Sequence, residues 1–137
     1  MAVKGEVHPR RPHLVTDSVG RVLLVRQRLR ERDRWGLPGG FLSINETPAA
    51  AAQRELAEET GLVVDGAALI TVAVYQQPWA WHFDHLYRVQ TPSTANELDF
   101  NRTAEVSDAA WFDRTDLPSL TRASFFALRE FGEDLWP

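Results

Sequence analysis

The segment from Thr47 to Gly61 has the clearest helix signals in the chain, and it constrains the fold more than any other feature. Thr47 is a favourable N-cap, and Pro48 follows at the first helical position, where its missing N–H costs nothing. Strong helix formers fill most of the interior, and Gly61 is the residue type that ends helices in a left-handed conformation. The sequence therefore predicts one long helix with defined ends.

Three glutamates, Glu55, Glu58 and Glu59, lie on one side of this helix because each residue advances by about 100° around the axis. Like charges at this spacing repel one another, and a divalent cation among their oxygens would remove the repulsion. Carboxylate oxygens suit Mg²⁺, Mn²⁺ or Ca²⁺. Two simpler alternatives stay open: the glutamates form a solvated helix face, and Arg54 pairs with Glu58 one turn away.

Strand-like segments, rich in β-branched and aromatic residues, precede and follow the helix. We expect strands at His13–Thr16, Arg21–Gln27, Leu69–Tyr75, Phe83–Gln90 and Ala109–Phe112, a hairpin turn at 17–20, a loop over Asp33–Gly40, and a second amphipathic helix over Thr121–Phe131. In that helix Phe125, Leu128 and Phe131 are predicted to face the core. The order lacks a βαβ rhythm, which indicates an α+β fold or an α/β sandwich with a mixed sheet.

Composition and charge narrow the class of protein. The 137 residues suit one domain, so we expect a single domain over 1–137. The absence of cysteine excludes disulfides, thiolate zinc sites and a cysteine nucleophile. No apolar run approaches the roughly 20 residues that span a membrane, and no signal-peptide pattern begins the chain, so a cytoplasmic location is expected. The net charge of −4 argues against stable nucleic-acid binding.

Arginines recur between Arg26 and Arg34, and they suit phosphate recognition because a guanidinium group is a fixed bidentate fork. A solvated basic loop is an equally simple interpretation.

The residues around the acidic helix match a longer pattern. Gly40 is followed by five residues and Glu46, then by seven residues and Arg54-Glu55-Leu56, and then by Glu58-Glu59 and Gly61-Leu62. This spacing resembles a complete Nudix box in which every fixed position is occupied. The preceding segment Trp35–Gly40 also resembles the usual approach to that box.

The resemblance implies a Nudix fold, an α/β/α sandwich with a mixed sheet in which the box forms a loop–helix–loop. It implies Mg²⁺-dependent or Mn²⁺-dependent hydrolysis of a nucleoside diphosphate linked to another moiety. In this chain Glu55, Glu58 and Glu59 would be metal ligands, and Glu46 would support the metal site. Arg54 would orient a glutamate through a charge-assisted hydrogen bond. Many relatives are homodimers, so a homodimer is one expected state.

A glutamate is also expected to take a proton from the attacking water. Family members differ in whether the box or a downstream loop supplies this base. Glu58 and Glu59 are the candidates in the box. Glu105 precedes the segment 110–113 and resembles a loop glutamate that reaches the metal site, and Glu97 is a second candidate in that loop region.

Substrate signals lie outside the box. Gln77-Pro78-Trp79 resembles, in part, the element that marks NADH diphosphatases, but Ala80 stands where that type has another proline. A proline at this distance also resembles the ADP-ribose hydrolases. Tryptophans here could stack on a base, although aromatic residues on strands more often belong to the core. The expected substrate contacts are Arg26, Arg34, Trp35, Gly39, Gly40, Trp79 and Trp81.

Three functions stay open. The first is a hydrolase of ADP-ribose, NADH or a nucleotide sugar, which releases two monophosphates. The second is a MutT-like nucleoside triphosphate pyrophosphohydrolase, which releases a monophosphate and pyrophosphate. The third is a catalytically silent module that binds nucleotides for regulation. The complete set of box glutamates argues against the third, because metal-ready carboxylates imply chemistry.

Overall fold

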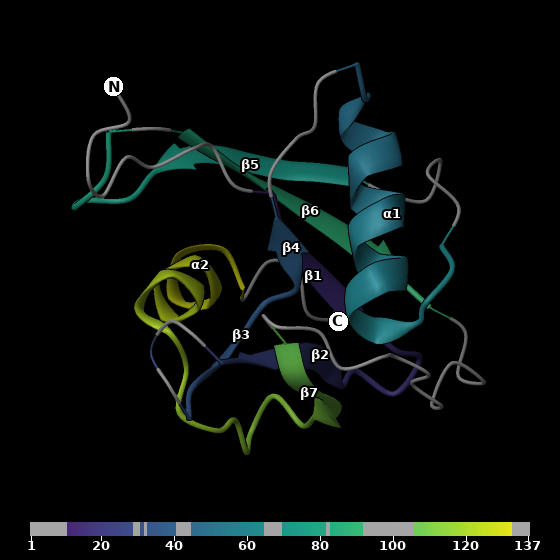
Figure 1. The fold of residues 1–137 in the computed structure, drawn as a ribbon. Coiled ribbons are helices and arrows are strands. Elements are labelled where there is room, and N and C mark those ends of the chain that lie inside the picture. The colour runs from purple at the N-terminus through teal and green to yellow at the C-terminus, as the bar shows by residue number, and fades with distance from the viewer. Residues whose placement is uncertain are drawn as a thin grey trace.

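The computed structural model describes residues 11–28, 31, 33–40, 45–64, 70–81, 83–91 and 106–132. The strands in these segments are β1 (Arg11–Thr16), β2 (Val22–Gln27), β3 (Trp35–Gly36), β4 (Gly39–Gly40), β5 (Ile70–Gln76), β6 (Phe83–Gln90) and β7 (Val106–Phe112). The helices are α1 (Pro48–Thr60) and α2 (Arg122–Phe131). The two helices lie on either side of the strands (Figure 1).

The sheet is mixed, as the sequence predicted. Its strand order is β3-β2-β1-β6-β5, with β4 paired to β1 and β7 paired to β2. The β1–β6 pair is parallel, whereas the other pairs are antiparallel. The parallel pair needs a crossover between its strands, and α1 lies within the connection from β1 to β6. The predicted α+β sandwich is confirmed.

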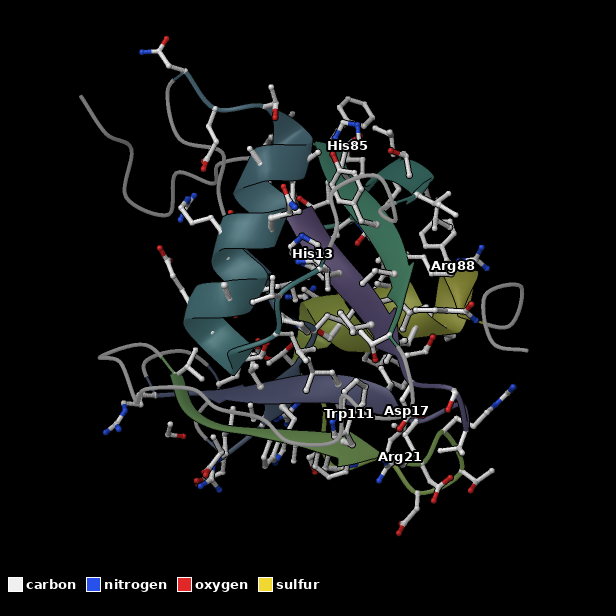
Figure 2. The ribbon with its side chains drawn as sticks, turned by 90° about the vertical axis from the view of Figure 1, so that its right-hand side faces the viewer. His13, Asp17, Arg21, His85, Arg88 and Trp111 are labelled. Atoms are coloured by element: carbon white, nitrogen blue, oxygen red, sulfur yellow. The ribbon has the colours of Figure 1, made fainter. Side chains whose placement is uncertain are left out.

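The predicted hairpin between β1 and β2 is also confirmed. Its turn is held by Asp17, whose Oδ1 accepts hydrogen bonds from the backbone N–H groups of Val19 (3.1 Å) and Arg21 (2.8 Å). The Arg21 side chain completes the turn by donating from Nε to Asp17 Oδ2 at 2.6 Å (Figure 2). Gly20 has φ +85°, a left-handed conformation that favours glycine.

Two hydrophobic clusters fill the space on the two faces of the sheet. On the α2 side, Leu14 and Leu24 pack with Ala127. On the α1 side, Val15 and Leu23 pack with Leu56. Successive residues of one strand thus serve different clusters, because side chains alternate between the faces of a sheet. This arrangement is the three-layer sandwich that the sequence indicated.

The ends of α1 match the sequence signals. Thr47 accepts a hydrogen bond through its side chain from Ala50 N at 3.1 Å. At the other end Gly61 adopts φ +80°, and its N–H donates to the Ala57 carbonyl at 3.0 Å. Among the described helices, none has the length and hydrophobicity needed to cross a membrane.

The segment Asp33–Gly40 was predicted as a loop, and this prediction is wrong in part. It contains the short strands β3 and β4. Trp35 N–H donates to the Ser119 carbonyl at 2.8 Å, and Thr121 N–H donates to the Trp35 carbonyl at 2.8 Å. These partners lie more than eighty residues away, and such long-range pairing leaves no local mark in the sequence.

The prediction that Phe125 faces the core is wrong, because 53% of its surface is exposed. Helix α2 instead turns Ser124 and Ala127 inward. Ser124 Oγ accepts a hydrogen bond from Leu37 N at 2.9 Å, and this buried bond fixes the rotation of the helix. Leu128 and Phe131 are partly buried against the core, as predicted.

A substitution at Leu56 tests how much the contact between α1 and the sheet contributes to stability. We expect Leu56→Ala to lower the free energy of unfolding by about 2–5 kcal/mol, because this fully buried side chain leaves a cavity. The matched control is Val63→Ala, since Val63 is 91% exposed, and we expect a change within about 0.5 kcal/mol. Urea unfolding measures both values. Equal effects of the two substitutions would contradict this packing.

Candidate metal and pyrophosphate site

The site is built where β4 meets both β1 and α1. Gly40 pairs with Arg11 and Gly39 pairs with Pro12. Both glycines also lie beside the acidic helix, next to the carboxylates of Glu55 and Glu59. Gly39 has φ +147°, and a Cβ atom at this position would overlap with the backbone carbonyl of Arg11. A glycine is therefore required for β4 to approach β1 this closely.

Glu55 is the most buried carboxylate of the helix, with only 5% of its surface exposed. A Cβ atom built on Gly40 would overlap with Glu55 Oε2, so a side chain at this position would displace the carboxylate. Within the described residues, neither Glu55 oxygen has a hydrogen-bond partner. Burial raises the pKa of Glu55 to about 7, and the nearby Arg54 charge offsets part of this rise.

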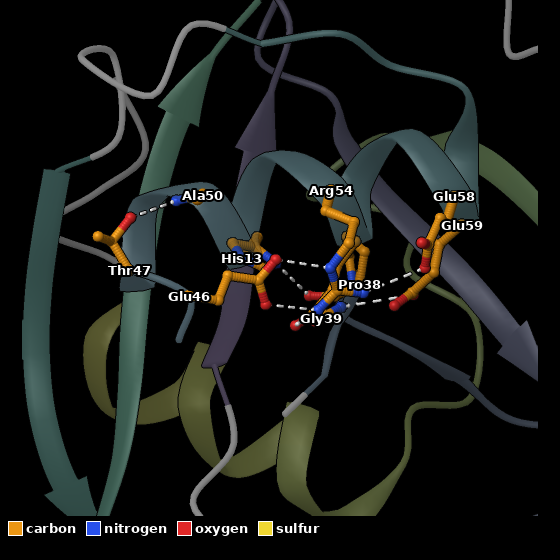
Figure 3. A network of polar contacts seen from close by, with 10 residues as sticks. His13, Pro38, Gly39, Glu46, Thr47, Ala50, Arg54, Glu58 and Glu59 are labelled. Carbon is orange, nitrogen blue, oxygen red and sulfur yellow. Dashed lines mark hydrogen bonds and ion pairs between the residues drawn. The ribbon is translucent and has the colours of Figure 1, made fainter. Parts of the chain in front are cut away.

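Arg54 organises the carboxylates around it (Figure 3). Its Nε and Nη2 donate to the two oxygens of Glu46 at 2.7 and 2.9 Å, which is a bidentate pair. Its Nη1 donates to Glu58 Oε2 at 3.3 Å, and its Nη2 lies 3.7 Å from Glu55 Oε1. The hydrogen bonds to Glu46 raise the pKa of Arg54 above its ordinary value. The i,i+4 pair between Arg54 and Glu58 that the sequence left open is therefore present.

The three predicted metal ligands have different environments. Glu55 is buried, whereas the Glu58 side chain is 61% exposed and pairs with Arg54. Glu59 Oε2 accepts a hydrogen bond from Gly39 N at 3.4 Å. Among the described residues, no three histidine, cysteine, aspartate or glutamate side chains are gathered closely enough to hold a metal ion together. The carboxylates share one region of the fold, and their roles as ligands stay a prediction.

Two residues of β1 belong to this site although the sequence did not single them out. Arg11 is 9% exposed, its Nε has no partner within the described residues, and its charge lowers the pKa of Glu55. His13 is fully buried, and its Nδ1 donates to the Pro38 carbonyl at 3.0 Å. Burial lowers the pKa of His13 to about 4, so the ring is neutral at pH 7. The positions of Arg11 and His13 near the acidic helix and Pro38 follow from the packing of β1 beside β4, which the sequence does not show.

The predicted substrate residues Arg26 and Trp35 lie on β2 and β3, and Arg34 directly precedes β3. Arg26 forms an ion pair with Asp108 of β7, and its guanidinium carbon lies 5.6 Å from the centre of the Trp35 ring. Trp35 packs edge-on against Phe112 with ring centres 4.9 Å apart. Arg34 donates to the Leu120 carbonyl at 3.3 Å, beside α2. The structure thus brings Arg26 and Trp35 together, while Arg34 lies near the second helix.

Trp79 and Trp81 lie in the turn between β5 and β6 and not on strands. Trp79 packs against Phe126 of α2 with ring centres 5.7 Å apart, and the Arg122 guanidinium carbon lies 3.8 Å from its ring centre. Trp81 is 94% exposed. The candidate bases Glu97 and Glu105 lie outside the described residues.

Comparison with known proteins agrees with this geometry. The model of the NUDIX domain family matches residues 7–134. The human protein named 8-oxo-dGDP phosphatase NUDT18 is 38% identical over 105 residues, which cover 74% of this chain and 31% of the human protein. The chain spans about a third of the length of the first curated relatives that it matches.

Solved structures share the fold at low sequence identity. The NUDIX domain of Shewanella oneidensis NrtR, crystallised with ADP ribose, superposes with a TM-score of 0.76 at 20% identity, covering 98% of this chain and 91% of that one. A bifunctional NMN adenylyltransferase/ADP ribose pyrophosphatase from Francisella tularensis, complexed with AMP and a Mn ion, also gives 0.76, at 21% identity, covering 93% of this chain and 42% of that one. With its intact box, its fold and the family match over nearly its whole length, this chain belongs to the NUDIX family.

Proposed function

We propose that this chain hydrolyses the pyrophosphate bond of a nucleoside diphosphate derivative, with a divalent cation held by Glu55, Glu58 and Glu59. The observation that carries the proposal is the Glu55 carboxylate, which is buried against Gly40 with no hydrogen-bond partner among the described residues. A buried carboxylate without a partner costs free energy, and a cation at this place would remove that cost. Membership of the NUDIX family supports the same chemistry.

Carboxylate oxygens are the ligands that a hard cation such as Mg²⁺ or Mn²⁺ prefers. Glu55, Glu58 and Glu59 would have to move closer to one another to bind such a cation together. When bound, the cation would neutralise the phosphate charge and make a bound water more acidic. The chain's own residues position the carboxylates and accept the proton. Arg54 holds Glu46 and Glu58 in place through its hydrogen bonds. Glu59, next to the Gly39 N–H, is our first candidate for the base that takes the proton from water.

For the substrate we propose a nucleoside diphosphate linked to another moiety, with ADP-ribose tested first. The solved NUDIX domain from Shewanella oneidensis that superposes on this chain holds ADP ribose. A second candidate, 8-oxo-dGDP, is favoured by the 38% identity with the human protein named for that substrate. A panel of ADP-ribose, NADH, 8-oxo-dGDP and dGTP with Mg²⁺ or Mn²⁺, followed by product identification, separates these substrates. Release of pyrophosphate from dGTP as the fastest reaction would favour the MutT-like alternative.

Replacing Glu59 tests the proposed base. We expect Glu59→Gln to lower kcat by at least about a hundredfold, because general base catalysis contributes that much or more. The fold should survive, since this side chain is partly exposed. Glu130→Gln is the matched control on exposed surface, and its kcat should equal that of the wild type. Turnover of the Glu59 variant at the wild-type rate would sink the assignment, and Glu58→Gln would then be tested.

Glu55 links metal binding to stability through its pKa. Its native pKa is about 7 and its ordinary value is 4.5, so its favourable contribution to stability is complete below pH 4.5 and is lost as the pH rises through 7. In EDTA, the free energy of unfolding of the wild type should therefore fall relative to Glu55→Gln between pH 5 and 8, by on the order of 2 kcal/mol.

Mg²⁺ at pH 8 should restore the stability of the wild type and have little effect on Glu55→Gln, because the cation binds the native ionised carboxylate. Urea unfolding at pH 5 and pH 8, with EDTA or Mg²⁺, measures all four conditions for each protein. If the difference in unfolding free energy between the two proteins were the same at both pH values, the proposal that Glu55 is buried and titrates near pH 7 would be wrong. An equal response of both proteins to Mg²⁺ would contradict its role as a ligand.

A further inference from the structure

A groove of about 1030 Å³ lies beside α2. Its walls are the segment 117–120, a stripe of α2 that includes Phe125 and Arg129, and Glu31 and Arg34 before β3. None of the box carboxylates lines it. Sites for small molecules usually enclose about 300–1,000 Å³, so this groove has room for a ligand of nucleotide size.

The described residues that line this groove carry a net positive charge, although the whole chain carries a net charge of −4. Among the described lining residues there are three arginines, Arg34, Arg122 and Arg129, and one acidic residue, Glu31. Glu31 Oε1 accepts a hydrogen bond from Arg122 N at 2.9 Å, so its carboxylate lies at the positive N-terminal end of α2. Arg129 also contacts Glu130 at 3.4 Å, but an exposed pair of this kind contributes little.

The rest of the lining is largely apolar. Leu117, Leu120 and Leu128 contribute aliphatic surface, and Phe125, which also lines the groove, is 53% exposed in total. The Arg129 guanidinium carbon lies 5.5 Å from the centre of the Phe125 ring. A cationic group beside an exposed aromatic ring is complementary to a ligand that carries both a negative charge and a flat apolar part.

The walls are held by contacts that exist without a ligand. Trp35 binds the backbone on both sides of Leu120, through Ser119 O and Thr121 N at 2.8 Å each. Arg34 Nη1 donates to the Leu120 carbonyl at 3.3 Å. Arg122 stacks on Trp79 with its guanidinium carbon 3.8 Å from the ring centre. Because these contacts fix the groove in advance, a ligand would not have to order it on binding.

We propose that this groove is a second ligand site, separate from the Nudix box, which binds a small aromatic phosphate of the size of a nucleoside monophosphate. The arginines hold the phosphate, and the apolar wall with Phe125 contacts the ring system. This site does not depend on the proposed hydrolase activity, because no box residue and no metal takes part in it.

Isothermal titration with AMP in the presence of EDTA tests the proposal on the whole chain. We expect Arg129→Gln and Phe125→Ala each to weaken AMP binding by about tenfold, the effect of losing one charged or aromatic contact. Both side chains are more than half exposed, at 61% and 53%, so neither substitution should unfold the protein. Arg28→Gln removes an exposed arginine outside the groove, and AMP binding should be unchanged.

Adenosine and inorganic phosphate serve as fragment probes, and each should bind at least about tenfold more weakly than AMP if both parts of the groove contribute. Phosphate binding as tight as that of AMP would overturn the aromatic part of the proposal. AMP binding that both groove variants retain, or that Arg28→Gln weakens equally, would overturn the site itself. Failure of hydrolysis in the substrate panel would leave these results unaffected, since they are measured without metal and without turnover.

Discussion

The close contact between Glu55 and Gly40 is the constraint on which the rest of the site depends. Because Gly40 also pairs with Arg11, this one approach fixes α1, β4 and β1 relative to one another. The contact places a carboxylate where water does not reach it, and burial of this kind is unfavourable unless the charge is compensated. The fold therefore accepts a local cost in the place where we propose that a cation binds, and functional sites commonly carry such costs.

The guanidinium group of Arg54 compensates the negative charges of three neighbouring glutamates to different degrees. Glu46 receives two short hydrogen bonds and Glu58 receives one longer bond, whereas Glu55 lies at 3.7 Å. The arginine thus holds the outer carboxylates by direct bonds and leaves the inner carboxylate only partly compensated. The positive charge of Arg11 also acts on Glu55, without a described hydrogen bond between the two. This arrangement keeps the oxygens of Glu55 available within the part of the chain that the structure describes.

Features that depend on local sequence could be predicted, and features that depend on distant partners could not. The caps of α1 follow from Thr47 and Gly61 themselves, and the box was evident from spacing alone. The strands β3 and β4 depend on β1, β2 and the segment before α2, which no local pattern reports. The inward face of α2 was misjudged because Ser124, a polar residue, turns inward to bind Leu37 N. Arg11 was not predicted as a site residue because its position depends on a distant partner, Gly40, with which it pairs.

The segment Trp35–Gly40 is attached at both of its ends, and this limits which changes of length this chain can accept here. Trp35 and Leu37 bind the segment before α2 and α2 itself, while Gly39 and Gly40 bind β1 and lie against α1. A residue added or removed between these attachments would have to break one of them, since a residue of extended chain spans about 3.3 Å. Gly39 has to stay a glycine because of its contact with the Arg11 carbonyl, and the attachments at both ends also fix the length of the stretch. The stretch therefore acts as a spacer of fixed length between the two helices.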